Sequence, residues 1–191
     1  MIRIENLSKS FGDKKVLDSF SELIEDKEHV GISGESGNGK TTLLRIIAGL
    51  EKKDSGKLEG YKADDISFMF QEPRLFRSLT ALDNVACVMK GRMKDNREKA
   101  RLMLERLSLS DSLYLYPSEL SGGMQRRVAL ARALVCDRSI VILDEPFESL
   151  DEVSRLSAIE LVREYCKEKT LLIVSHDKND IEMLCDREIK I

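Results

Sequence analysis

The segment of this sequence with the clearest chemistry is glycine-rich and runs from Gly34 to Thr41, Gly-Glu-Ser-Gly-Asn-Gly-Lys-Thr. Its spacing fits G-x-x-x-x-G-K-[ST], a pattern that binds phosphate when a strand precedes it and a helix follows. Glycines let successive backbone N–H groups point at one anion, and the positive end of the following helix adds to that field. Lys40 is placed to reach β- and γ-phosphates, and the Thr41 hydroxyl can bind Mg²⁺. The alternative, an ordinary glycine-rich turn, leaves three glycines in one short loop unexplained.

A second group is the acidic pair Asp144-Glu145, which ends the apolar run 140–143. An apolar strand that ends in a carboxylate delivers that group to the carboxyl edge of a parallel sheet, where α/β folds bind ligands. Asp144 is a natural partner for Mg²⁺, and Glu145 is placed to orient and deprotonate an attacking water. Asp144 could instead cap a turn before Pro146. Beside a phosphate loop, the hydrolytic interpretation is favoured.

A third group is the pair of glycines that follows Ser121. Ser121 can cap a helix, while Gly122 and Gly123 expose N–H groups at its positive end. Two glycines in a first helical turn cost up to ~1 kcal/mol each relative to alanine, and the close approach of an anion would explain that cost. A plain capped helix start is the alternative. Because the chain has one lysine-bearing phosphate loop, this site most simply meets the nucleotide of another copy.

The elements that must position these groups begin as short β-rich runs and continue as alternating strands and helices. Strands are expected at 2–7, 16–23, 29–33, 66–70, 140–143, 171–174 and 187–191, and a loop at 51–56. Helices are expected at 40–50, at 80–106 with a polar break at 90–96, after Ser121, at 153–167 and at 178–184. Short apolar runs without alternation suit strands buried on both faces, hence a parallel sheet covered by helices. Residues 72–125 lack clear strands and are predicted to form a helical insertion.

Size and composition narrow the class of protein. The 191 residues suit one domain, or one domain with a small appendage. Lys and Arg total 31 against 34 Asp and Glu, so no basic excess supports a dedicated nucleic-acid binder. The longest apolar runs have four residues, whereas a membrane span needs roughly 20. The first residues lack the charged and then apolar pattern of a signal peptide. Four scattered cysteines without a CxxC pair fit a reducing cytoplasm.

Taken in order, these motifs resemble those of the ATP-binding cassette (ABC) ATPases over essentially the whole chain. The motifs that carry the resemblance are the phosphate loop, Gln71, Leu120–Gln125, Asp144-Glu145, Ser149-Leu150-Asp151 and His176. The resemblance implies an α/β fold with a P-loop NTPase core and a mainly parallel sheet, an N-terminal antiparallel β-subdomain and an inserted α-helical subdomain. It implies a single domain, in which 1–71 and 126–191 form the core and 72–125 the helical part.

In that family two cassettes pack head to tail and sandwich two ATP molecules, and the resemblance implies a role for each matching residue. Phe11 would stack on adenine, where the family more usually has a tyrosine. The other residues that would bind nucleotide are Gly34, Glu35, Ser36, Gly37, Asn38, Gly39, Lys40, Thr41, Thr42, Ser121, Gly122, Gly123 and Asp151. The catalytic residues would be Glu145, His176 and Gln71, and the Mg²⁺ ligands Thr41, Gln71 and Asp144.

The function that the resemblance implies is the ATP-hydrolysing subunit of a membrane transporter, with ATP and Mg²⁺ as cofactors. Its partners would be separate integral membrane subunits docked near residues 71–84, a second cassette in a homodimer, and a solute-binding protein if the transporter imports. The run 144–151 is similar to cassettes of the nitrate, sulfonate and taurine importer group, which favours import. The chain would lie in the cytoplasm, on the inner face of the cell membrane. Two alternatives remain: a soluble ABC ATPase of DNA repair or translation, and a clamp that signals across a membrane complex without transport.

Overall fold

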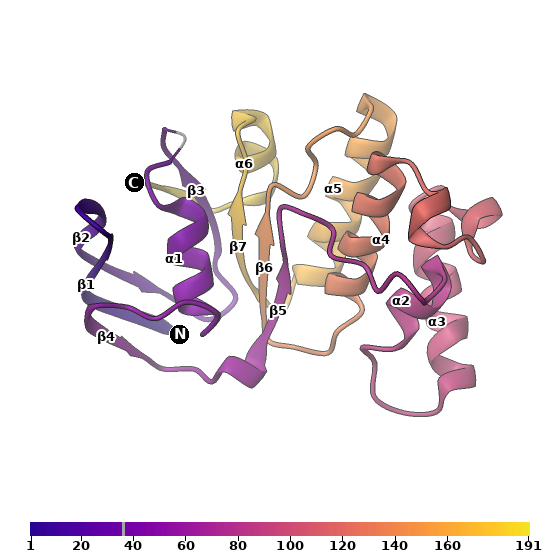
Figure 1. Cartoon of the computed structure of the whole chain (residues 1–191), viewed down its shortest axis with the longest axis horizontal. Helices are drawn as coiled ribbons and strands as arrows, with labels where there is room; N and C mark the ends of the chain where they lie inside the picture. The colour runs from indigo at the N-terminus through magenta and orange to yellow at the C-terminus, as the bar shows by residue number, and fades with distance from the viewer. Residues whose placement is uncertain (36) are drawn as a thin grey trace. The chain divides into compact units, whose positions relative to one another are not determined.

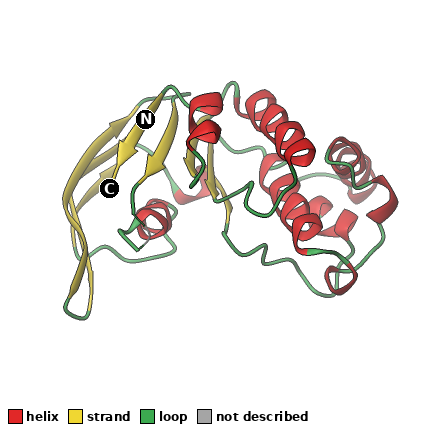
Figure 2. Ribbon diagram, turned by 90° about the horizontal axis from the view of Figure 1, so that it is seen from above, coloured by secondary structure: helices red, strands yellow, loops and turns green. Residues whose placement is uncertain are grey.

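The structure is a computed structural model and describes residues 1–35 and 37–191. The chain divides into two compact units, which are described separately. The first unit comprises residues 1–68, 138–144 and 166–191, and the second comprises residues 69–137 and 145–165. The strands gather in the first unit, and the second consists mainly of helices and loops (Figure 2).

The first unit contains a three-stranded antiparallel sheet in the order β2-β1-β4. The strands are β1 (Ile2–Phe11), β2 (Lys14–Ile24) and β4 (Ser55–Glu59). Alternating residues of β1, among them Ile2 and Ile4, are buried in the core, as expected for a sheet with one covered face. The turn Gly12-Asp13 joins β1 to β2 and pairs Phe11 with Lys14. This register fixes the position of Lys14 at the start of β2.

The second sheet of this unit has the order β5-β6-β7-β3-β8 (Figure 1). Its strands are β3 (His29–Ser33), β5 (Ile66–Met69), β6 (Ile140–Asp144), β7 (Thr170–Val174) and β8 (Arg187–Lys190). The pairs β3–β7, β3–β8 and β6–β7 are parallel, and every residue of β6 and β7 is buried. The register pairs Asp144 with Val174 and Ile32 with Val174. The carboxyl ends of β3, β6 and β7 therefore lie at one edge of the sheet.

Two helices of the first unit follow strands of this sheet. Helix α1 (Lys40–Ile47) follows β3, and its residues Leu43, Leu44, Ile46 and Ile47 enter the hydrophobic core. Helix α6 (Lys178–Leu184) follows β7 and packs against β3. A Cβ at Gly31 of β3 would lie 2.4 Å from Cγ2 of Ile181, so this glycine allows the close packing.

The second unit is built on α2 (Ala81–Ala86), α3 (Met93–Arg106) and α4 (Gly122–Leu134), which pack against one another, together with most of α5 (Glu152–Cys166). Three short 3₁₀ turns complete the elements: η1 (Ala63–Asp65), which lies in the first unit, and η2 (Ser110–Ser112) and η3 (Pro117–Glu119). The fully buried Asn84 of α2 donates to the carbonyls of Phe76, Leu79 and Thr80 and accepts from the N–H of Phe76. It therefore fixes the loop that leads into α2.

The predicted fold class is confirmed: a mixed α/β chain with a mainly parallel sheet, an antiparallel N-terminal sheet and a helical part. The predicted loop at 51–56 is wrong at its end, because β4 begins at Ser55 and completes the antiparallel sheet. Its polar, glycine-containing sequence gives no apolar signal, and pairing with β1 forms it. The first two strands are also longer than predicted, α1 stops at Ile47, and α3 already begins at Met93. In the described residues, no helix combines the length and apolar character that a bilayer crossing requires.

The predicted helical segment 72–125 lies entirely within the second unit, which also contains α4 and residues 145–165. The assignment of one domain, with 126–191 in the core, stays a prediction.

Candidate functional site

The glycine-rich loop connects β3 to α1, which is the strand–loop–helix setting that its motif requires. Gly39 adopts a left-handed φ of 97° as the N-cap of α1, and a Cβ there would lie 2.6 Å from Cγ1 of Val16. A Cβ at Gly34, with φ 145°, would lie 2.1 Å from the carbonyl oxygen of Ile191. Both positions therefore need glycine for backbone conformation and for space. Among the predicted phosphate-binding residues, Ser36 lies outside the described residues.

Lys40, the first residue of α1, is held inside this loop. Its side chain is 7% exposed, and Nζ donates to the carbonyls of Gly34 at 2.8 Å and Glu35 at 2.9 Å. The ammonium is therefore already encircled by the loop that would carry the phosphates. A second cation, Lys14, donates to the carbonyl of Gly37 at 3.3 Å. Sequence reasoning missed Lys14, because only the hairpin register brings this residue to the loop.

Thr41 and Asp144 meet directly behind the loop. Thr41 Oγ1 donates to Asp144 Oδ1 at 3.2 Å, and Asp144 is 1% exposed at the end of β6. A hydroxyl and a carboxylate at this spacing are hard oxygen donors of the type that Mg²⁺ prefers. The donor set present therefore fits Mg²⁺ beside a nucleotide phosphate.

The other predicted residues of the first unit lie on the surface. Phe11 ends β1 with 49% of its surface exposed, and Lys9 Nζ lies 4.9 Å from the centroid of its ring. His176 is exposed in the turn between β7 and α6, and Asn38 is exposed in the loop, whereas Thr42 is half-buried in α1. The turn around His176 is braced, since Ser175 Oγ donates to Asp180 at 2.5 Å and accepts from the N–H of Asp177 at 3.1 Å.

In the second unit, Ser121 caps α4. Its Oγ accepts from the N–H of Met124 at 3.2 Å, as the sequence predicts. Gly122 is exposed, and a Cβ there would meet no atom within 4 Å, so space for an approaching group exists above this turn. A Cβ at Gly123 would lie 3.3 Å from the carbonyl oxygen of Ser149. Gly123 thus lets the backbone of Ser149 approach the start of α4.

Asp151 begins α5 as a helix cap. Its carboxylate accepts from the N–H of Ser154 at 2.9 Å and from the hydroxyl of Ser154 at 2.7 Å. The hydrogen bond from the backbone N–H of Ser154, followed by the one from its hydroxyl, is the largest cause that lowers the pKa of Asp151 below its usual value. Asp151 therefore caps α5. Its predicted contact with nucleotide stays a prediction.

Gln71 and Glu145 are brought together by a residue that sequence reasoning missed. Arg126 of α4 donates through Nη1 to the carbonyl of Glu145 and through Nη2 to the carbonyl of Gln71 at 3.0 Å. Glu145 is 6% exposed and has a left-handed φ of 52°, whereas Gln71 is exposed. The contacts of Arg126 span 19 and 55 positions of the chain, so no local pattern could indicate them.

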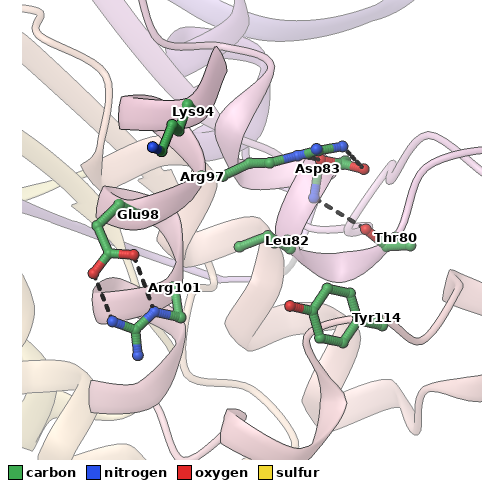
Figure 3. A pocket seen from close by; sticks show the side chains of 8 residues that line it. All are labelled: Thr80, Leu82, Asp83, Lys94, Arg97, Glu98, Arg101 and Tyr114. Atoms are coloured by element: carbon green, nitrogen blue, oxygen red, sulfur yellow. Dashed lines mark hydrogen bonds and ion pairs between the residues drawn. The ribbon is translucent and has the colours of Figure 1, made fainter. Parts of the chain in front are cut away.

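The second unit also contains a pocket of about 270 Å³ lined by side chains of α2, α3 and the segment after α3 (Figure 3). Arg97 makes two bonds to Asp83, at 2.7 and 3.0 Å, and Arg101 pairs with Glu98 on the wall of the pocket. Lys94 and Tyr114 complete its polar lining. The lining charges of both signs largely pair with each other. Thr80, Leu82 and Asp83 of the lining belong to the predicted docking segment 71–84, whereas none of the predicted nucleotide-binding or catalytic residues lines the pocket. The pocket is therefore distinct from the phosphate loop.

Comparison with known proteins places these features in one family. A family model described as ABC transporter matches residues 17–148. The aliphatic sulfonates import ATP-binding protein SsuB 2 of Mesorhizobium japonicum is 41% identical over 189 residues, which cover 98% of this chain and 75% of that protein. The sulfate/thiosulfate import ATP-binding protein CysA of Photorhabdus laumondii is 40% identical over 206 residues, covering 98% of this chain and 57% of that protein. This chain thus spans little more than half the length of that relative.

A solved structure supports the same family. The dimeric, post-hydrolysis state of the ATP-binding cassette MJ0796, bound to ADP and Pi, superposes with a TM-score of 0.89 at 30% identity. The match covers 100% of this chain and 94% of that one.

Proposed function

The chain belongs to the ABC transporter family, and we propose that it is the ATP-binding and ATP-hydrolysing subunit of a transporter. The observation that carries this proposal is the arrangement behind the phosphate loop. Lys40 lies inside the loop, and the Thr41 hydroxyl contacts the buried carboxylate of Asp144. This set of donors suits a nucleoside triphosphate with its metal ion.

In the proposed mechanism, Lys40 exchanges its bonds to Gly34 and Glu35 for bonds to the β- and γ-phosphates. Backbone N–H groups at the start of α1 complete the phosphate cradle. Thr41 and Asp144, with Gln71 as a further ligand, would hold Mg²⁺, which when bound neutralises charge on the phosphate oxygens. The exposed ring of Phe11 would stack on the adenine, since aromatic rings attract one another in offset-stacked arrangements.

Glu145 accepts a proton from the attacking water, and Gln71 helps to orient that water. His176 donates a hydrogen bond to the γ-phosphate from the turn after β7. A buried carboxylate at the end of an apolar strand suits the role of the base, because burial excludes competing water. These three residues form the proposed catalytic group.

Two copies of the chain would close around two nucleotides. The N–H groups at Ser121, Gly122 and Gly123 would contact the γ-phosphate held by the opposite copy, and Asp151 lies in the adjoining segment. The open space above Gly122 supports this role, as does the dimeric state of the solved cassette at 30% identity. Hydrolysis would remove the bridging phosphate and release the two copies.

We propose that the chain docks on separate integral membrane subunits through residues 71–84 and lies on the inner face of the cell membrane. The exposed ring of Phe76, with 53% of its surface accessible, lies in this segment. Relatives named for the import of aliphatic sulfonates and of sulfate or thiosulfate support import of an oxyanion-bearing solute. Import would require a solute-binding protein as a further partner.

The test is purification of the tagged chain from detergent-solubilised membranes of its host, followed by mass spectrometry. A multi-span membrane protein in stoichiometric amount is expected, and a co-purifying solute-binding protein would establish import. The variant Phe76→Ala should reduce this capture while ATP hydrolysis by the isolated chain remains. Stoichiometric capture of ribosomal or DNA-repair proteins instead would contradict the transporter assignment.

A further inference from the structure

We propose that Arg126 is a positioning residue for ATP hydrolysis, which sets the backbone of Glu145 and of Gln71 with one guanidinium group. Arg126 lies on α4 and is 9% exposed. It donates to the carbonyls of Glu145 and Gln71 and to Glu148 Oε2 at 3.0 Å. All four residues belong to the second unit. The proposal rests on the proposed catalytic roles of Glu145 and Gln71.

The charge of Arg126 is balanced in a way that favours a fixed geometry. A buried guanidinium needs a partner, because burial penalises an unpaired charge. Glu148 supplies that partner from a side chain that is half exposed. The planar guanidinium has several donors in fixed directions, which lets it hold three acceptors at once. A lysine, with one nitrogen, cannot reproduce this arrangement.

The backbone at Glu145 shows why a holding contact is needed. Its φ of 52° is in the left-handed region, which residues with a Cβ rarely adopt. It also precedes Pro146, and a residue before proline favours the extended region. Such a conformation persists where surrounding contacts over-determine it. Arg126 makes the contact to the carbonyl of this residue, and the orientation of that peptide fixes the direction in which the Glu145 side chain leaves the chain.

Helix α4 also forms hydrogen bonds to the segment that follows Gln71. Arg132 of α4 donates to the carbonyls of Pro73 at 2.9 Å and Arg74 at 3.0 Å. Two arginines separated by six positions on α4 therefore anchor residues 71–74, but only Arg126 also reaches Glu145. Because Ser121 caps this same helix, a shift of α4 would be transmitted to Gln71 and Glu145 together through Arg126.

The experiment compares steady-state ATP hydrolysis of the full chain with that of Arg126→Met and Arg126→Lys. Methionine keeps an unbranched apolar stem but removes all three bonds. We expect kcat to fall by about 10- to 100-fold with KM for ATP changed less than about threefold, because misplacement by ~1 Å can cost 10²-fold. Arg126→Lys should lie between wild type and Arg126→Met.

The matched control is Arg106→Met, which removes a two-bond pair with Glu164 in the same unit, at 2.6 and 3.0 Å, without touching Gln71 or Glu145. Its kcat should equal that of wild type. If Arg126→Met does not fold, as judged by its melting temperature, Glu148→Gln carries the test. This variant removes only the charge partner, so kcat should fall below that of wild type while KM for ATP stays unchanged, and an unchanged kcat would overturn the inference.

A second background separates positioning from a general structural loss. In Glu145→Gln, whose base is absent, adding Arg126→Met should lower the residual rate by less than twofold. An equal fall in both backgrounds, or a normal kcat in folded Arg126→Met, would overturn the inference. Normal turnover in Glu145→Gln alone would instead contradict the proposed function, so the two failures are distinguishable.

Discussion

The phosphate loop of the first unit and the Gln71–Glu145 region of the second hold their functional groups by different means. In the loop, Lys40 bonds to carbonyls five and six positions earlier, and glycines set the path of the backbone. Around Glu145, Arg126 joins acceptors 19, 22 and 55 positions away. The loop is therefore encoded locally, whereas the positions of Glu145 and Gln71 depend on packing within the second unit.

This difference predicts that substitutions in the two regions change different kinetic quantities. Loss of a group in the loop should weaken nucleotide binding, because the loop faces the ground-state phosphates. Loss of a group around Glu145 should lower turnover and leave binding intact, because those contacts matter where the water attacks. Four predictions test this division.

The largest effect is expected from Glu145→Gln. Removal of a general base typically costs 10²- to 10⁴-fold in rate, so kcat should fall by about that factor. Affinity for ATP should remain within about twofold of wild type, and the variant should accumulate as an ATP-bound dimer. Phosphate release gives the rate, and size-exclusion chromatography with ATP gives the dimer. A weakened ATP affinity with normal kcat would reverse the roles of the two regions.

The next effect is expected from Lys40→Ala. A charge-assisted hydrogen bond is worth ~1.5–3 kcal/mol, so the affinity for ATP should fall by about 10- to 100-fold. The dissociation constant of a fluorescent ATP analogue measures this directly. Lys15→Ala is the matched control, since Lys15 pairs with Asp18 on the exposed hairpin and should bind ATP as wild type does. Unchanged affinity in Lys40→Ala would remove the phosphate role of the loop.

A smaller effect is expected from Lys14→Ala. Lys14 contributes one bond of 3.3 Å to the loop carbonyl of Gly37 and a positive charge near the phosphates. Loss of a solvent-exposed charge contact is worth ~0.2–1 kcal/mol, so ATP affinity should fall by about two- to fivefold. Raised ionic strength should shrink this difference, because salt screens exposed charges. A difference that does not depend on salt would indicate loss of loop structure instead.

The same division explains what could be predicted from the sequence. The phosphate loop, the carboxylates after β6 and the Ser121 cap were predictable, because each depends on residues close in the chain. Strand β4 was missed, since its polar residues become a strand only by pairing with β1. Lys14 depends on hairpin register, and Arg126 on helix packing, and neither leaves a local pattern. The residues that hold a site together were therefore harder to predict than those expected to perform its chemistry.

The smallest effect concerns Asp151, which lies in the second unit but is held locally, like the loop. Its pKa is lowered by hydrogen bonds from Ser154, so the ionised form stabilises the fold. This contribution is present above the usual carboxyl pKa of about 4 and is lost as the pH falls through the lowered value. Asn can also cap a helix, so Asp151→Asn removes mainly the charge. The melting temperature of wild type should exceed that of Asp151→Asn at pH 7, and the difference should shrink as the pH falls below about 4. A difference that stays constant below this pH would mean that the geometry of the cap, and not its charge, separates the two variants.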